Sequence, residues 1–469
     1  MIGALSLIGL IVLPRASFAH AFDERYDLPI PLSFFICGAI LIVLFTYLLA
    51  ILFVKEDQKL KQWISGSHTT DSLLFHIPLI LQALVNALVI FSLCFIILLS
   101  FFGPSNPLMN MASHFIWVNW WVGVPLLFAM FGSMMHGIDP FQAIATLCKT
   151  ELRVNLSRSL INLMAALGRW PAVIGLLYWC WIEVVYPNAA LPKYLGVLVT
   201  MWLISGIIGR MILGNQGWNE NWDFFRIYFS YFGNISPLYR FKGSVYIGKP
   251  FVRLIQDARP YPGNVAFVIA MLSTVLFDGL HSSPVWLGFQ TLFEGRFDNN
   301  GYFLGFLGVL LVWAFFYFVF LGACLLVPQN SHAKIGGRLS NAMYIAEIFA
   351  PTLIPIALAY HIAHNISSLI IQGQNIFILS SDPLNQGWNL FGTANFYPNI
   401  SILDAKTVWY VALISIVIGH VVSIFLTHLV AIKEFKNSAI AGKAVLPLTI
   451  LMILFTAVSL MILAEPLVS

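Results

Sequence analysis

The sequence has few charged residues, because Asp, Glu, Lys and Arg together make up only 9% of its 469 positions. Soluble domains contain about 25%. Hydrophobic residues account for 59% of the chain. The chain therefore has too few polar side chains to cover a surface that faces water. The net charge of +4 is small, and no basic patch points to a nucleic-acid partner. We predict an all-α, polytopic transmembrane helix bundle whose main partner is the lipid bilayer.

Cysteine is also scarce, and familiar enzyme motifs are missing. The five cysteines are odd in number and form no C-x-x-C pair, which argues against a disulfide framework and against a thiolate metal site. The chain has no P-loop, no G-x-G-x-x-G after a strand, no G-x-S-x-G and no H-E-x-x-H. These absences leave membrane-embedded chemistry, transport or a structural role in a larger complex.

Residues 1–19 are typical of a signal peptide. An apolar run extends from Ile2 to Leu13, and the small residues Ser17 and Ala19 stand where a signal peptidase prefers them. Cleavage would leave His20 as the first residue, and residues 20–469 would form one integral membrane domain. No Lys or Arg precedes the apolar run, so an uncleaved anchor is the alternative.

Ten later stretches are apolar and long enough to span a bilayer, which takes about 20 helical residues. Their ranges are 30–54, 80–102, 114–135, 160–186, 194–214, 264–288, 302–327, 342–371, 407–432 and 444–464. With alternating helices, nearly all Lys and Arg residues fall on one side, which the positive-inside rule makes cytoplasmic. We therefore predict a bacterial inner (plasma) membrane protein whose mature termini are both extracytoplasmic.

Two loops are unusually long. Residues 215–262 combine many aromatic residues with Arg and Lys, which favours an interfacial segment resting on the inner membrane surface over a partner-binding surface. Residues 372–406 form the longest outer loop, which is either a plain connection or a lid over the bundle.

Two pairs of polar residues lie within predicted spanning helices. His361 and His364 are three residues apart, and so are Asp278 and His281, so the members of each pair share a helix face. The predicted topology puts both pairs at one depth in the outer half of the membrane. Intramembrane ionisable residues are costly and usually functional. Three further groups are expected in the same layer: Glu183, His114 and the mature N-terminal His20.

Three imidazoles and a carboxylate form a ligand set suited to a divalent transition metal such as zinc, copper, iron or manganese. We therefore regard His361, His364, His281 and Asp278 as candidate metal ligands, with His20 as a further one. The alternatives are helix–helix hydrogen bonding and a metal-free proton or ligand site. Elsewhere, Arg169 within a predicted helix needs a counter-charge, for which Glu347 is the best match in depth.

Four sequence runs resemble a bacterial family of multi-spanning membrane proteins labelled fenitrothion hydrolase. They are HAFDERYDLPIP at 20–31, FDGL at 277–280, YHIAH at 360–364 and GWNLFG at 387–392. The similarity extends over nearly the whole chain. It implies hydrolysis of the aryl phosphotriester bond in a small lipophilic substrate, and it assigns no catalytic residue.

The resemblance, joined to the polar residues, gives a mechanism as a hypothesis. His361, His364 and His281 would hold a metal that activates water, while Asp278 would be a fourth ligand or the general base. Asp278 and Glu183 are the candidate catalytic carboxylates. Two other classes stay open: a transporter of copper-like metal ions or small solutes, and an accessory subunit with partner subunits in a membrane complex.

Overall fold

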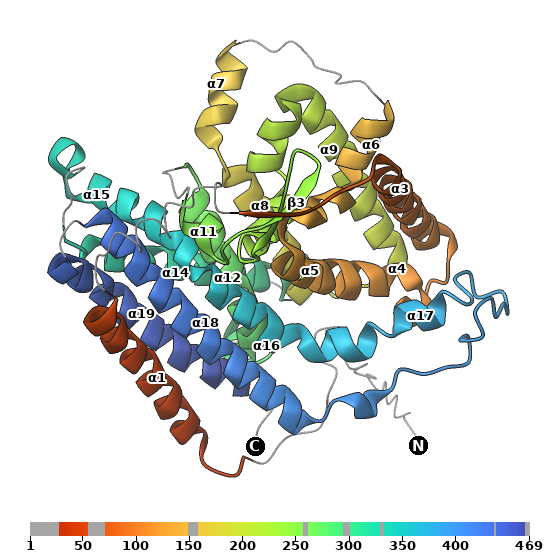
Figure 1. Ribbon diagram of the computed structural model, residues 1–469. Helices are drawn as coiled ribbons and strands as arrows, with labels where there is room; N and C mark the ends of the chain where they lie inside the picture. Colours follow the sequence, from red (N-terminus) through yellow and green to blue (C-terminus); the bar gives the residue numbers. More distant parts are fainter. Residues whose placement is uncertain are drawn as a thin grey trace, which may run out of the picture.

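The structure is a computed structural model that describes residues 28–54, 71–148, 158–256, 261–293, 301–328, 333–435 and 438–464. The predicted signal peptide and His20 lie outside the described residues. Within them, almost every element is a helix (Figure 1). The predicted all-α helix bundle is confirmed.

Nine segments of the described chain are long and apolar enough to cross a bilayer. Six of them are single helices: α1 (Leu32–Phe53), α3 (Leu79–Phe102), α9 (Pro192–Asn221), α12 (Asn264–His281), α14 (Tyr302–Leu325) and α18 (Ala405–Glu434). The C-terminal helix α19 (Ser438–Ala464) is a seventh. The remaining two are each made of several shorter helices. One consists of α4 (Met111–His114), η3 (Phe115–Gly123) and α5 (Val124–Phe131). The other consists of α15 (Ala333–Phe349), η5 (Ala350–Leu353), α16 (Ile354–Gln372) and α17 (Asn375–Leu379).

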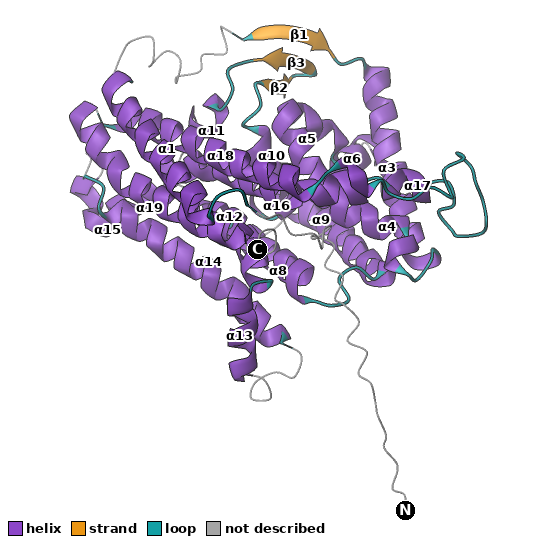
Figure 2. Ribbon diagram, turned by 90° about the horizontal axis from the view of Figure 1, so that it is seen from below, coloured by secondary structure: helices purple, strands orange, loops and turns teal. Residues whose placement is uncertain are grey.

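The predicted span 160–186, the fourth of the ten, is not one helix. It is divided into α7 (Arg158–Leu167) and α8 (Trp170–Val185). The break lies at Gly168, which has φ +51°, and a Cβ there would lie 2.4 Å from the carbonyl oxygen of Pro262. A residue with a side chain could hardly adopt this conformation, so the chain turns where glycine permits it. The span predicted over 264–288 is also shorter: α12 ends at His281, and α13 (Pro284–Phe293) projects from the bundle (Figure 2).

Part of the segment 215–262 packs against other helices of the bundle. Its helix α10 (Phe224–Gly233) packs against α5, α8 and α16, and its Phe225, Tyr228, Phe229 and Phe232 are buried. The aromatic face of α10 thus packs against protein, and the interfacial position of 215–262 stays a prediction. After it come β2 (Leu238–Phe241), β3 (Ser244–Ile247) and α11 (Val252–Gln256), and β1 (Ser72–His76) completes an antiparallel sheet of order β1-β3-β2.

The helices differ in how much of their surface faces the protein. In α1, α3 and α9 only 22% of the residues in the most apolar window are buried, against 83% in α12 and in the segment that contains α16. In Figure 1, α1, α18 and α19 lie along one flank and α3 and α9 along the other, with α12 and α16 between them. Polar side chains on α12 and α16 consequently face protein and not lipid.

Candidate functional site

The two predicted polar motifs meet through Asp278 and His364. The Oδ2 atom of Asp278, in the last turn of α12, lies 2.6 Å from Nε2 of His364 on α16. The side chains are 11% and 12% exposed, respectively. A hydrogen bond between a carboxylate and an imidazole is strong when either group is charged, so this pair couples α12 to α16, the two helices that carry the predicted polar pairs.

A cavity of about 290 Å³ adjoins the pair. Asp278 reaches its wall, together with Glu183, His281, Asn365 and Ser368. Apolar residues of η3, namely Trp117, Val118 and Val122, also line the cavity. A cavity that combines apolar walls with a few polar groups is typical of a small-molecule site. The cavity lies where α8 and α12 end, which is the predicted outer end of the bundle.

Glu183 contributes the second carboxylate of the cavity from the last turn of α8. Its Oε1 accepts a hydrogen bond of 2.8 Å from Nε1 of Trp121. Within the described residues it meets no cation. The two carboxyl groups therefore have different surroundings, since Asp278 is paired with an imidazole and Glu183 with an indole N–H. Such a difference is how two carboxyl groups come to act as base and acid in one site.

His361 points away from the cavity, towards η3 and α10. Its Nε2 lies 3.0 Å from the carbonyl oxygen of Val122, so this nitrogen must carry the proton and donate. Its Nδ1 is then an acceptor, and the hydroxyl of Tyr228 lies 3.3 Å from it. Val122 belongs to η3, a π-helical segment, and π-helices often occur at functional sites because their altered register changes which backbone groups face outward.

The other two histidines of the predicted layer have different positions. His281 lines the cavity, and its ring lies 5.7 Å from that of Phe277 and 5.9 Å from that of Trp286. His114 is not part of the cavity wall. Its Nε2 lies 3.2 Å from the carbonyl oxygen of Leu108. His114 is therefore separate from the cavity, and its place in the same membrane layer stays a prediction.

The predicted metal ligands do not converge in this arrangement. His361 uses both ring nitrogens for Val122 and Tyr228, and His364 Nε2 is directed at Asp278. Among the described residues, no group of three or more His, Cys, Asp or Glu side chains has the geometry to hold a metal ion. His20 lies outside them. The described side chains would have to rearrange to bind a metal, and the metal site stays a prediction.

Some residues of the site were not anticipated from the sequence. Asn365 and Ser368 line the cavity, and each lies four residues after one of the two histidines of α16, so helical spacing could have identified them. Tyr228 had no such signal, because it belongs to the segment predicted to rest on the membrane surface. None of the residues 372–406 lines the cavity.

Arg169 obtains its partners from a second polar cluster. Its Nη1 donates to Asn264 Oδ1 at 2.5 Å and to the hydroxyl of Tyr231 at 2.6 Å. The Nδ2 of Asn264 in turn donates to Glu347 at 3.0 Å. Arg169 thus reaches the predicted counter-charge Glu347 through Asn264, and not by the direct ion pair that was expected.

Comparison with family models, with curated proteins and with solved structures gave no match. The chemistry of the residues around the cavity is thus the basis for a functional assignment.

Proposed function

We propose that the protein is an integral membrane hydrolase that cleaves a small, lipophilic, neutral ester in the cavity between α8, α12 and η3. The observation that carries this proposal is the 2.6 Å contact between Asp278 and His364 beside a cavity that also holds Glu183. The resemblance to fenitrothion hydrolase suggests aryl phosphotriesters as the substrate class.

The reaction needs a base for water and, where the leaving group is only weakly acidic, an acid that protonates its oxygen. Asp278 accepts a proton from a water molecule while the water oxygen attacks the phosphorus atom. His364 is a positioning residue, since its Nε2 holds the carboxylate of Asp278 towards the cavity. The bond between phosphorus and the leaving oxygen breaks, and Glu183 delivers its proton to that oxygen. Proton exchange with water then returns Asp278 to its carboxylate form and Glu183 to its acid form.

The apolar walls account for the lipophilic substrate. Trp117, Val118, Val122 and Leu287 cover much of the cavity, and apolar surfaces of this kind bind apolar groups by removing them from water. The substrate would reach the site from the outer leaflet, in which it is concentrated. A soluble binding pocket is then unnecessary.

Two variants of the purified protein test the proposal with neutral aryl phosphotriesters as substrates. Asp278→Asn should lower kcat/KM by about 10²–10⁴-fold because the general base is lost. Glu434→Gln is the matched control, since Glu434 bonds Tyr344 at the far end of α18 and lies outside the cavity. Full activity of a stably inserted Asp278→Asn protein would refute the mechanism.

The role of Glu183 is tested by the leaving group. A strongly acidic phenol departs as its anion without help, whereas a weakly acidic alcohol needs a proton. Glu183→Gln should therefore cost little rate with the first kind of ester and progressively more with the second. An equal loss for every leaving group would show that Glu183 only shapes the cavity.

The predicted zinc, copper, iron or manganese ion is tested separately by elemental analysis of the wild type, His361→Ala and His364→Ala. Stoichiometric metal that both variants lose would replace the metal-free mechanism by a metal-dependent one. Uptake of metal by proteoliposomes without ester turnover would instead identify a transporter. Partners that co-purify in stoichiometric amounts, again without turnover, would identify an accessory subunit.

A further inference from the structure

Asn365 is a polar side chain of the candidate site that takes no part in the two proton transfers of the proposed reaction. It belongs to α16 and lies in the wall of the cavity of about 290 Å³, together with Asp278 and Glu183. Only 7% of the residue is exposed. An amide is costly to bury unless its hydrogen bonds are made, so its place beside the two carboxyl groups needs a physical reason.

The hydrogen bonds of Asn365 leave part of its amide unused. Its Nδ2 donates to the carbonyl oxygen of His361 at 3.1 Å. This contact identifies the nitrogen end of the amide, since a carbonyl oxygen can only accept. An asparagine amide has two N–H donors and an acceptor oxygen. Among the described residues the second N–H and Oδ1 have no hydrogen-bond partner, and a molecule in the cavity can supply one.

The bond to His361 does not by itself explain an asparagine at this position. In a regular α-helix the carbonyl of residue 361 already accepts the backbone N–H of residue 365. The side chain therefore adds a second bond to a group that is satisfied without it. Alanine and leucine also favour a helix more than asparagine does. The amide consequently fits a role towards the cavity better than a role within its own helix.

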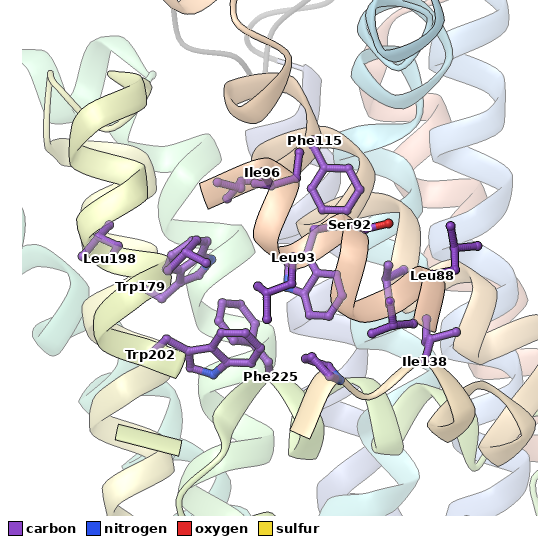
Figure 3. A pocket seen from close by; sticks show the side chains of 16 residues that line it. Leu88, Ser92, Leu93, Ile96, Phe115, Ile138, Trp179, Leu198, Trp202 and Phe225 are labelled. Atoms are coloured by element: carbon purple, nitrogen blue, oxygen red, sulfur yellow. The ribbon is translucent and has the colours of Figure 1, made fainter. Parts of the chain in front are cut away.

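A second cavity shows that polar walls are not a general feature of this protein. Its volume is about 250 Å³, and residues of α3, η3, α8 and α9 contribute to its lining (Figure 3). Ser92 is the only lining residue whose side chain carries an oxygen atom. A cavity of similar size is thus walled almost entirely by apolar groups. The amide and carboxyl groups of the candidate site are therefore particular to that site.

The proposed reaction needs a hydrogen-bond donor in addition to a base. When the water oxygen attacks phosphorus, an electron pair of the P=O bond moves onto the phosphoryl oxygen, and it returns when the bond to the leaving oxygen breaks. A fixed donor that faces this oxygen stabilises the charge in between. Asp278 is a base and cannot donate, and Glu183 gives its proton to the leaving oxygen. Trp117 already donates its indole N–H to Ala189 at 3.1 Å.

We propose that the unused N–H of Asn365 donates to the phosphoryl oxygen of the substrate and stabilises the charge that develops there. This role rests on the proposed ester hydrolysis. Oxygen accepts hydrogen bonds far better than sulfur does. The site consequently selects esters with a P=O group over otherwise identical esters with a P=S group, and Asn365 determines this specificity.

The test compares two substrates that differ in a single atom, a dialkyl aryl phosphate and the corresponding phosphorothioate with a P=S group. Asn365→Leu replaces the amide by an apolar side chain of similar size. We expect kcat/KM for the P=O ester to fall by about 10²–10³-fold, and that for the P=S ester by less than about tenfold. The loss should appear in kcat, because the charge develops only in the transition state.

Asn86→Leu is the matched control. Asn86 is 3% exposed, accepts a hydrogen bond of 2.8 Å from Gln82 Nε2 within α3 and lies outside the cavity wall. Its replacement removes a buried amide without touching the site, so the ratio of the two kcat/KM values should not change. If Asn365→Leu does not fold, Asn365→Ala is measured instead, and the same fall in the ratio is expected.

The two esters also separate failure of this role from failure of the proposed function. Equal losses with both esters in the Asn365 variants would show that the amide only shapes the cavity, and would overturn the role while the hydrolase assignment stands. A stably inserted wild-type protein that hydrolyses neither ester would refute the hydrolase assignment, and the role of Asn365 with it.

Discussion

Gly419 of α18 approaches Ala359 of α16 so closely that a Cβ on the glycine would lie 2.5 Å from the alanine Cβ. The same atom would be 2.8 Å from the carbonyl oxygen of Pro355. Helix α16, which carries both candidate histidines, can therefore pack this closely against α18 only because residue 419 has no side chain. Small residues allow this kind of close backbone contact between membrane helices.

Gly419→Ala should consequently separate the two helices. Overpacking typically costs about 1–3 kcal/mol, which we expect as a lower midpoint of thermal unfolding in detergent. Gly38→Ala is the control, because nothing lies within 4 Å of a Cβ at that position in α1. Replacing a helical glycine there should leave stability unchanged or raise it by up to about 1 kcal/mol. Equal effects of the two substitutions would show that the α16–α18 contact is not tight.

Replacing His361 should reveal whether its role is structural. His361→Phe leaves the Val122 carbonyl and the Tyr228 hydroxyl without the imidazole, and an unsatisfied buried polar group costs about 1–3 kcal/mol. Tyr228→Phe removes only the longer, 3.3 Å contact and should cost about 0.5–1.5 kcal/mol. Unfolding midpoints of the two single variants and of the double variant measure the coupling free energy between the side chains of His361 and Tyr228. Additive losses would mean that the two side chains do not interact.

The pH dependence of stability should depend on His136, which lies in η4 (Gly132–Ile138) after the span that ends at Phe131. Burial, together with the nearby Arg226 guanidinium, lowers the pKa of His136 to about 4, although Asp139 opposes the shift. An unfolded histidine has a pKa of about 6.5. Between these values only the unfolded chain binds the proton, so stability falls as the pH drops from 6.5 to 4, by on the order of 2–3 kcal/mol.

His136→Gln isolates this contribution, because glutamine can still bond Ser230, whose hydroxyl lies 3.1 Å from His136 Nε2. The wild-type unfolding midpoint should decline between pH 6.5 and pH 4.5 more steeply than that of the variant. Parallel curves for the two proteins would assign the decline to other groups.

The bundle could be predicted from the sequence because bilayer spans are long apolar runs, as in α3 and α14. The break at Gly168 could not, since it depends on the approach of Pro262, 94 positions later in the chain. The burial of α10 could not be predicted from the sequence either. Its Arg226 suggested a surface position, but the pairing of Arg226 with Asp139 satisfies the charge that the sequence shows as unpaired.

Only part of the candidate site could be predicted from the sequence, for a geometric reason. Residues three apart on a helix differ in direction by about 60°, so His361 and His364 share a face without sharing a partner. In the structure His364 meets Asp278 on α12, while His361 meets Val122 on η3. Spacing identifies the face, whereas the choice of partner depends on which helices pack there.

The orientation of the bundle is testable with single cysteines. Tyr397 is 89% exposed in the loop between α17 and α18, and Phe241 is 55% exposed at the end of β2. If the positive-inside prediction is right, a membrane-impermeant maleimide should label Tyr397→Cys in intact cells but should label Phe241→Cys only after permeabilisation. Wild-type labelling gives the background from native cysteines, of which Cys37 and Cys94 are exposed on apolar helices. The reverse pattern would place the cavity of Asp278 and Glu183 on the cytoplasmic side, and substrate would then have to approach from the inner leaflet.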